Sequence, residues 1–491
     1  MKIPLMIPVS RLKNSSENKP QGILPVIMGY AAKGELVIQD PPVSSRYSIR
    51  DLFRSHFKEY LSSHEVPFYK ERAVRAIMSC GTGELGYTLS KCSECGTITM
   101  HADSCGNRNC PSCGYPKQLK WINDRNADLL EGVPYVHAVF TLPHDLNSLI
   151  YNNQKVLLNH LFSSVKQSVL DLCMEKYELI PGLVMVLHTF SSDMSLHYHI
   201  HMLATAAGIS SDKTSFKDFS RSGYFLPVDV LSMRYRGNFL QGLKDLKQKG
   251  KLLFSGTAAN LKNSYEWNEL LNTCYEKDWN VEVKKYQVYH KDPDQQANAL
   301  TAGNFPEYVM HPPISSESVH HPGNTEESSD GANERAPDAE IVNNYFSQYT
   351  FRIAITDNSI KTYSDEEVEF DYKQYHDGNC TRKTMKLKTD EFIRRFLLHI
   401  LEPGFQRIRY AGFLASCIRK KMLSFIRELL DLTEQSDPLK DMTLAELVEH
   451  FTGINPAVCP VCSGKTSISA RRIKIGVLAY RFINSCYIRD S

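Results

Sequence analysis

Hydrophobic and polar positions divide the chain into segments of helical spacing. Apolar residues recur at helical intervals from Ile49 to Met78, which predicts two helices, and do so again over residues 115–130 and 145–178. Residues 226–280 show the same period, with a short strand-like break at Leu252–Phe254. Helices are therefore predicted in several segments, with stretches of different composition between them.

The segments between and after these helices contain short runs rich in β-branched and aromatic residues. Tyr135–Leu142, Leu183–Phe190 and Leu196–Thr205 each predict a strand, as does Val281–Tyr289. The second and third runs flank Ser191-Ser192-Asp193, a turn-forming sequence, and so predict a β-hairpin. Helices and strands in this order predict an α+β fold with a central antiparallel sheet flanked by helices.

Two segments lack any such period. Residues 1–48 contain several prolines and predict an irregular N-terminal arm. Residues 311–340 contain no aromatic residue, are crowded with Pro, Ser, Asn and Gly, and hold seven acidic residues against one arginine. This composition offers too little apolar surface to bury, so it predicts a disordered insertion.

Composition places the chain among ordinary globular proteins. Its 491 residues suffice for about three domains. Because 57 basic and 55 acidic residues nearly cancel, a nucleic-acid surface would have to be a local patch. The N-terminus lacks the features of a signal peptide, and no apolar run reaches the roughly 18 residues of a membrane span. We therefore expect a soluble cytoplasmic protein without a membrane partner.

Clustered cysteines form a candidate metal centre. Five of the thirteen cysteines lie between Cys92 and Cys113, and four of these form two C-x2-C pairs. In a reducing compartment, such pairs supply the thiolates of a tetrahedral structural Zn²⁺. The predicted ligands are Cys92, Cys95, Cys110 and Cys113. Three neighbours could replace one of them: Cys80, His101 and Cys105.

A further pair, Cys459-Pro-Val-Cys462, stands close to the C-terminus. No second pair follows it, and only Cys486 lies downstream. We interpret it as either half of a degenerate zinc ribbon or an inert pair.

The strand Leu196–Thr205 carries a second candidate metal site. Successive side chains of a strand alternate between its faces, so His197, His199 and His201 project to one side. Two imidazoles at this spacing can chelate one divalent ion. In isolation, such a pair is more often a packing or surface feature.

Two tyrosines, Tyr345 and Tyr349, stand four residues apart in a segment of helical spacing, Ile341–Tyr349. On a helix both phenols would lie on one face, about one turn apart. Tyrosines in this arrangement are usually packing residues, so their meaning depends on the other motifs.

Residues 382–421 form a basic run, with eleven Lys and Arg against three acidic residues. Aromatic residues interleave with the cations, a combination that suits phosphate contacts together with base stacking on single strands. The candidate DNA contacts are Arg394, Arg395, Arg407 and Arg409. The alternative is a solvated cationic face.

Together these motifs resemble the HUH-superfamily transposases of the rolling-circle type, the insertion-sequence family whose enzymes carry two catalytic tyrosines. The cysteine cluster, His199-Ile-His201 and Tyr345-x3-Tyr349 follow one another in the order of that family. Residues 134–144 and 392–414 are similar to further family blocks, and the resemblance extends over about residues 50–465. The chain departs from the family in its Ala204–Gly208 segment, where the family is Gly-rich, and in its acidic insertion.

The resemblance implies a metal-dependent nickase and strand transferase. It would cut and rejoin single-stranded DNA at transposon ends and target through a 5′-phosphotyrosine on Tyr345 or Tyr349. His199 and His201 would hold a catalytic Mg²⁺ or Mn²⁺. Because hard cations prefer oxygen, a third ligand is expected, with Gln348 and Asp193 as candidates. His197 is a further candidate, either as a ligand or as a DNA contact.

The resemblance also implies a domain division. An arm at 1–48 precedes a helical and zinc-binding DNA-recognition domain at 49–130, the HUH nuclease domain at 131–425, and a C-terminal helical segment with a cysteine pair at 426–491. A bacterial, nucleoid-associated protein is expected, and the oligomeric state is left open. The alternatives are a non-catalytic zinc-dependent nucleic-acid-binding protein, such as a decayed transposase, and a zinc metalloenzyme acting on small substrates.

Overall fold

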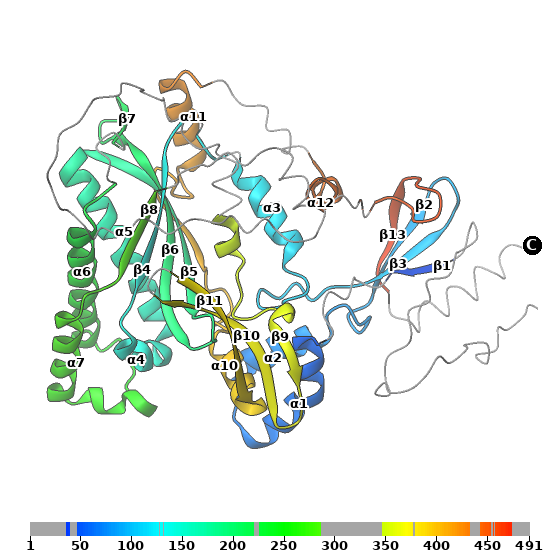
Figure 1. The fold of residues 1–491 in the computed structure, drawn as a ribbon. Coiled ribbons are helices and arrows are strands. Elements are labelled where there is room, and N and C mark those ends of the chain that lie inside the picture. The colour runs from blue at the N-terminus through cyan, green and yellow to red at the C-terminus, as the bar shows by residue number, and fades with distance from the viewer. Residues whose placement is uncertain are drawn as a thin grey trace, which may run out of the picture.

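The chain contains both helices and mainly antiparallel strands, which confirms the predicted α+β class (Figure 1). The computed structural model describes residues 36–39, 47–126, 128–130, 132–219, 225–285, 346–376, 379–432, 442–452, 455 and 457–473. The insertion predicted at 311–340 and Tyr345 lie outside the described residues. No helix among the described residues is long and apolar enough to cross a membrane.

The main sheet is antiparallel and has the strand order β12-β5-β6-β4-β8, with β7 also paired to β6. It contains each strand that the sequence predicts, β8 within its described part, together with the unpredicted β7 and β12. The bounds are β4 (Tyr135–Thr141), β5 (Leu179–Phe190), β6 (Leu196–Ser210), β7 (Phe216–Asp218), β8 (Val281–Lys285) and β12 (Ile408–Gly412).

Three long helices cover one face of the main sheet: α5 (Gln154–Tyr177), α6 (Val228–Gln248) and α7 (Ser264–Glu276) (Figure 1). Tyr198 and Ile200 of β6 are fully buried in this layer. Because side chains alternate along a strand, His199 and His201 must point to the opposite face. Shorter helical segments connect the layer: η2 (His144–Leu146), α4 (Asn147–Asn152) and η4 (Gly256–Lys262).

The opposite face of the sheet is covered in part by α3 (Tyr115–Asn126), a short helix at residues 346–350 and α11 (Arg419–Leu429). Phe346, which is fully buried, packs in one cluster with Val186 and Leu203 of the sheet. This contact brings the segment of the predicted catalytic tyrosines onto the face that carries the histidines.

A second core lies beside the main sheet. The helices α1 (Ile49–Ser63), α2 (Phe68–Met78) and α10 (Thr389–Leu398) pack there with a three-stranded antiparallel sheet. The sequence did not predict this sheet, whose order is β11-β10-β9. Its strands are β9 (Ile360–Tyr363), β10 (Glu367–His376) and β11 (Asn379–Lys388), and the short helix η5 (Asp357–Ser359) precedes β9. The Ser48 side chain caps α1 by accepting a hydrogen bond from the Asp51 amide at 3.1 Å.

A peripheral sheet joins segments from both ends of the chain (Figure 1). Its order is β1-β3-β2-β13, and β1 lies within the segment expected to be irregular. The expected domain boundaries therefore separate elements that share one sheet, since β13 pairs antiparallel with β2. The bounds are β1 (Leu36–Gln39), β2 (Tyr87–Cys92), β3 (Ile98–Ala102) and β13 (Thr466–Ile473), and α12 (Leu444–Thr452) contacts α3.

Candidate active site and metal centres

Three imidazoles from two neighbouring strands meet on the sheet face opposite α5–α7. His188 on β5 is the register partner of His199 on β6, and His201 follows two residues later. One ring nitrogen of each residue lies within 4.8 Å of the other two. All three side chains are buried. The predicted pair is thus joined by His188, a residue that the sequence pattern alone does not single out.

Hydrogen bonds show which ring nitrogen carries the proton in two of these histidines. His188 Nε2 lies 2.6 Å from the Tyr349 carbonyl oxygen, and His199 Nδ1 lies 3.0 Å from the His197 carbonyl oxygen. A carbonyl only accepts, so both of these nitrogens carry a proton. In the neutral rings, the lone pairs are therefore on His188 Nδ1 and His199 Nε2.

The third ring, His201, is paired with a fourth histidine. His201 Nδ1 lies 2.9 Å from Nε2 of His137 on β4, and both side chains are buried. If His201 donates in this pair, its Nε2 lone pair is available to an ion. Each of the three imidazoles then has one nitrogen anchored by the protein, as is usual for histidine ligands of metals.

The environment keeps these imidazoles neutral. Burial, reinforced by the neighbouring His197, lowers the pKa of His199 to about 3. Burial also lowers the pKa of His188 and of His201 well below the ordinary value, and nearby imidazoles add to the effect. Because a metal binds neutral imidazole, the site is prepared for a cation without first losing protons.

Tyr349 lies against this cluster. Its ring centroid is 4.2 Å from that of His201 and 4.9 Å from that of His137. The helix at 346–350 holds it there, since Phe346 and Thr350 on the same helix are buried. The structure therefore brings one of the two predicted tyrosines to the predicted histidines.

The two residues proposed as third ligand have other surroundings. The Asp193 carboxylate lies in the β5–β6 turn, where it accepts hydrogen bonds from the Ser195 amide at 3.0 Å and the Ser195 hydroxyl at 2.8 Å. Burial would raise the pKa of Asp193, but hydrogen bonds from Ser191 and Ser195 outweigh it and lower that pKa. Gln348 is exposed on its helix. The buried His188 is the third residue of the cluster instead.

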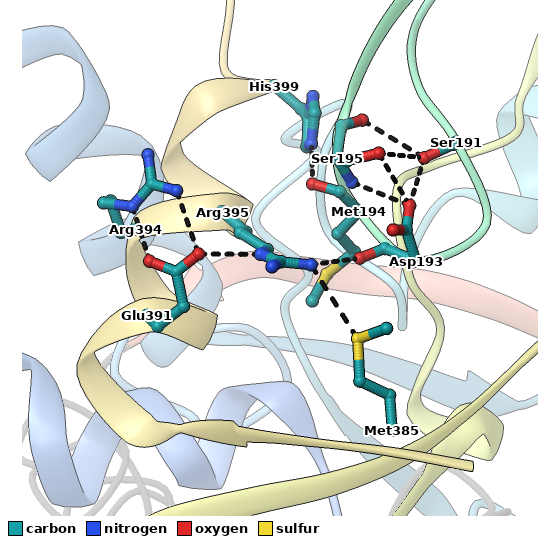
Figure 2. A network of polar contacts seen from close by, with 9 residues as sticks. All are labelled: Ser191, Asp193, Met194, Ser195, Met385, Glu391, Arg394, Arg395 and His399. Atoms are coloured by element: carbon teal, nitrogen blue, oxygen red, sulfur yellow. Dashed lines mark hydrogen bonds and ion pairs between the residues drawn. The ribbon is translucent and has the colours of Figure 1, made fainter.

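Helix α10 clamps the turn that joins the two histidine strands (Figure 2). The Arg395 guanidinium donates to the Asp193 carbonyl at 3.0 Å, and His399 Nε2 donates to the Met194 carbonyl at 3.0 Å. Met194 has a positive φ of 61°, a conformation that costs about 1–2 kcal/mol for a side chain of this size. The clamp offsets that cost and fixes the connection between His188 and His199.

Replacing His399 with glutamine tests this clamp through its pH dependence. Burial lowers the pKa of His399 from 6.5 to about 4, so the unfolded chain takes up this proton first as the pH falls. Below about pH 6.5 the wild-type free energy of unfolding should therefore decrease, with about 3 kcal/mol from this group by pH 4. Denaturant titrations of both proteins between pH 7.5 and 4.5 measure the difference, and parallel curves would contradict it.

The four arginines predicted to contact DNA differ in their surroundings. Glu391 forms ion pairs with Arg394 at 2.6 Å and with Arg395 at 2.8 Å (Figure 2). Arg409 donates to the Asn159 side chain and lies 4.1 Å from the centroid of the Phe162 ring. DNA contact by these three stays a prediction.

The charge of Arg407 reaches the histidine cluster, where it contributes to the lowered pKa of His188. Arg407 donates to the Arg352 carbonyl at 3.2 Å, and the Arg352 charge in turn lowers the pKa of His188, His199 and His201. Burial and the charge of Arg108 lower the pKa of Arg407 to about 10. Arg352 and Arg407 thus place positive charge near the histidines.

The four cysteines predicted to bind one Zn²⁺ are divided between two clusters, which corrects the predicted quartet. The first cluster consists of Cys80, Cys105, Cys110 and Cys113, and the second of Cys92, Cys95, Cys459 and Cys462. The β2–β3 hairpin carries Cys92 and Cys95 to the end of the peripheral sheet, next to the segment that enters β13. The chain then returns, so that Cys110 joins the core containing Cys80 and α2.

The first cluster has the contacts of a thiolate centre. Cys105 Sγ lies 3.6 Å from Cys113 Sγ. Backbone amides point at two of the sulfurs, that of Cys105 at Cys80 Sγ (3.3 Å) and that of Asn107 at Cys105 Sγ (3.4 Å). Such amide contacts stabilise negative charge on sulfur, which a zinc ligand requires.

Comparison with known proteins decides the family. Residues 52–142 match the family model described as a transposase zinc-binding domain, and residues 182–328 and 331–421 match that of a putative transposase. The chain is 30% identical to the putative transposase y4qJ of Sinorhizobium fredii over 419 residues. This aligned region is 84% of this chain and 92% of that protein. The chain belongs to the IS91 family of transposases.

This IS91-family transposase is also similar to the transposase for insertion sequence element IS801 of Pseudomonas savastanoi pv. phaseolicola. The identity is 22% over 442 residues, 89% of this chain and 92% of that one. No solved structure matches. The resemblance to insertion-sequence transposases and the presence of a zinc-binding domain are therefore confirmed.

Proposed function

We propose that this transposase nicks and rejoins single-stranded DNA through a 5′-phosphotyrosine intermediate, as in rolling-circle transposition. The observation that carries the proposal is the meeting of three buried, neutral imidazoles with the ring of Tyr349. The positive charges of Arg352 and Arg407 near the histidine cluster favour the binding of a phosphate there.

His188, His199 and His201 would hold a divalent ion. The donor set fits, because each ring has one anchored nitrogen and one that can face the other two rings. An ion bound here would polarise the scissile phosphate and neutralise charge that develops on its oxygens. Three imidazoles suit Mn²⁺ better than Mg²⁺, which prefers oxygen ligands, so we expect higher activity with Mn²⁺.

The tyrosines supply the nucleophile. The phenol oxygen of Tyr349 or Tyr345 forms a bond to phosphorus while the bond from phosphorus to the 3′ oxygen breaks. The phenol loses its proton, and the departing oxygen gains one to become a 3′-hydroxyl. Since the two tyrosines are four residues apart, a second phenol one turn away would permit a second strand transfer while the first end stays attached.

The zinc-binding and arginine-rich regions would bind and position the DNA. We propose that the first cysteine cluster, Cys80, Cys105, Cys110 and Cys113, holds a structural Zn²⁺ beside the core of α1, α2 and α10. Arg108, in the loop of this cluster, donates to the Phe405 carbonyl at 2.8 Å and so connects the cluster to the segment that leads to Arg407.

A covalent adduct assay tests the proposal. Single-stranded oligonucleotides that cover both flanks of the gene are incubated with the transposase and Mn²⁺, and the products are separated in detergent. A 5′-phosphotyrosine leaves the downstream fragment on the protein, so a 3′ label should migrate with the protein and a 5′ label should be released. Duplex DNA and samples without Mn²⁺ or Mg²⁺ are the controls.

Two outcomes would contradict the proposal. Adduct that carries the 5′ label would reverse the polarity of the linkage. Single-strand binding that weakens with salt, without adduct under any divalent ion, would favour the non-catalytic nucleic-acid-binding protein instead.

A further inference from the structure

The second cysteine cluster combines residues from distant parts of the chain. Cys92 and Cys95 stand at the end of β2, whereas Cys459 and Cys462 precede β13. Cys95 and Cys459 are 364 positions apart in sequence. The second pair lies beyond the residues matched by either family model, which end at 142 and 421.

The sulfur positions fit a tetrahedral zinc site. Cys92 Sγ lies 3.5 Å from Cys462 Sγ, and Cys95 Sγ lies 3.6 Å from Cys459 Sγ. Zinc–sulfur bonds of about 2.3 Å in a tetrahedron separate the sulfurs by about 3.8 Å. The observed separations are close to that edge and much longer than the roughly 2.05 Å of a disulfide.

The two cysteine loops have the same backbone design. The amide of Cys92 donates to the Thr97 carbonyl at 2.9 Å, and the amide of Cys459 donates to the Gly464 carbonyl at 2.8 Å. In both loops, the amide of the first cysteine thus bonds to the carbonyl five residues later. The residue after the second cysteine has a positive φ in both loops, 74° for Gly96 and 59° for Ser463. Two matched loops that face one another are the arrangement of a zinc ribbon.

Close packing keeps the two loops in register. A Cβ on Gly464 would lie 2.6 Å from Glu94 Cγ and 3.2 Å from Cys92 Sγ, so only glycine fits there without a shift. The Ser93 amide donates to the Lys465 carbonyl at 3.1 Å, and β13 continues the pairing along β2.

The peripheral sheet has little else to stabilise it. Its own buried apolar cluster, among the described residues, consists of Leu89, Met100 and Ile473, with a few partly buried neighbours. A sheet with so small a core usually needs a metal or disulfide. Its cysteines are free thiols in the structure, which leaves a metal.

We propose that Cys92, Cys95, Cys459 and Cys462 bind a second Zn²⁺ and complete a zinc ribbon from the two ends of the chain. The ion ties the C-terminal segment to the β2–β3 hairpin of the zinc-binding domain. The transposase therefore carries two zinc ions with different tasks, one beside the helical core and one in the ribbon.

Zinc content measured by plasma mass spectrometry tests the stoichiometry. The full chain should hold about two Zn²⁺, and Cys459→Ser/Cys462→Ser should hold about one. The matched control is Cys380→Ser/Cys417→Ser, because both of these cysteines are exposed and outside the clusters; it should keep two. Equal zinc content in the wild type and in the Cys459/Cys462 variant would overturn the proposal.

Thiol alkylation of the wild-type chain gives a second readout that does not depend on a variant folding. Cys462 and Cys417 are both exposed, so without a metal they should react at comparable rates. With zinc bound, Cys462 should be protected at least tenfold relative to Cys417, and a chelator should abolish that protection. Peptide mass spectrometry measures both, and equal labelling before chelation would also overturn the proposal.

Discussion

Replacing Tyr345 and Tyr349 together with phenylalanine is expected to reduce the covalent protein–DNA adduct by at least about 10³-fold, because phenylalanine has no oxygen with which to attack phosphorus. Binding to single-stranded DNA should be nearly unchanged, since only two hydroxyl groups are removed. Gel quantification of the 3′-labelled adduct, together with a binding isotherm on the same oligonucleotide, measures the two effects separately.

The single variants separate the roles of the two phenols. Tyr349 contacts the histidine cluster, with its ring 4.2 Å from that of His201, so Tyr349→Phe alone should already lower the adduct yield. Tyr410→Phe is the matched control. Tyr410 lies on β12, and its hydroxyl accepts a hydrogen bond from Trp121 Nε1 at 3.2 Å. Tyr410→Phe removes the same atom as Tyr349→Phe and should leave the adduct yield within about twofold of the wild type.

The double variant can also refute the mechanism. If its adduct persists at the wild-type level, another residue forms the covalent link and the tyrosines are packing residues. In that case the contact between Tyr349 and His201 would be only part of the core that Phe346 forms on this face of the sheet.

The periodicity of the sequence was sufficient for β4, β5, β6 and β8 of the main sheet, but not for β7 and β12. Leu196–Met202 alternates apolar and polar side chains, so its strand and the common direction of His199 and His201 follow from local rules. The three-stranded sheet of β9–β11 was missed, because β11 is dominated by exposed lysine, arginine and threonine and has only one-sided burial. A run of basic residues indicates a charged surface and does not by itself predict a strand.

Pairings between distant segments could not be predicted in the same way. His188 lies in an apolar strand and meets His199 only through the register of β5 with β6, which a single sequence does not specify. A polar residue within the run Leu183–Phe190 was the one available signal. The cysteines were grouped by nearness in sequence, whereas strand pairing of β13 with β2 groups them across the chain.

The sequence and the structure point to different residues as the third ligand of the catalytic metal. Sequence reasoning selected Gln348 and Asp193 because hard cations prefer oxygen. In the structure the Asp193 carboxylate is engaged by Ser191 and Ser195 in the β5–β6 turn, and His188 is the buried group beside His199. Variants of these three residues therefore discriminate the two assignments.

His188→Ala is expected to lower metal-dependent nicking by about 100-fold or more at a Mn²⁺ concentration that saturates the wild type. The variant loses one of three ligands and also the hydrogen bond that connects the cluster to the Tyr349 carbonyl. If the loss arises from metal binding, excess Mn²⁺ should restore part of the activity and the Mn²⁺ titration should move to higher concentration by at least about tenfold.

Asp193→Asn and Gln348→Ala should retain activity within a few-fold and leave the Mn²⁺ titration in place, because neither side chain belongs to the histidine cluster. His160→Ala controls for loss of an imidazole elsewhere; this ring interacts with the Phe239 carbonyl at 2.8 Å in the α5–α6 layer. Should Asp193→Asn or Gln348→Ala shift the Mn²⁺ titration while His188→Ala does not, an oxygen ligand completes the site. His188 would then serve to hold the tyrosine helix through its bond to the Tyr349 carbonyl.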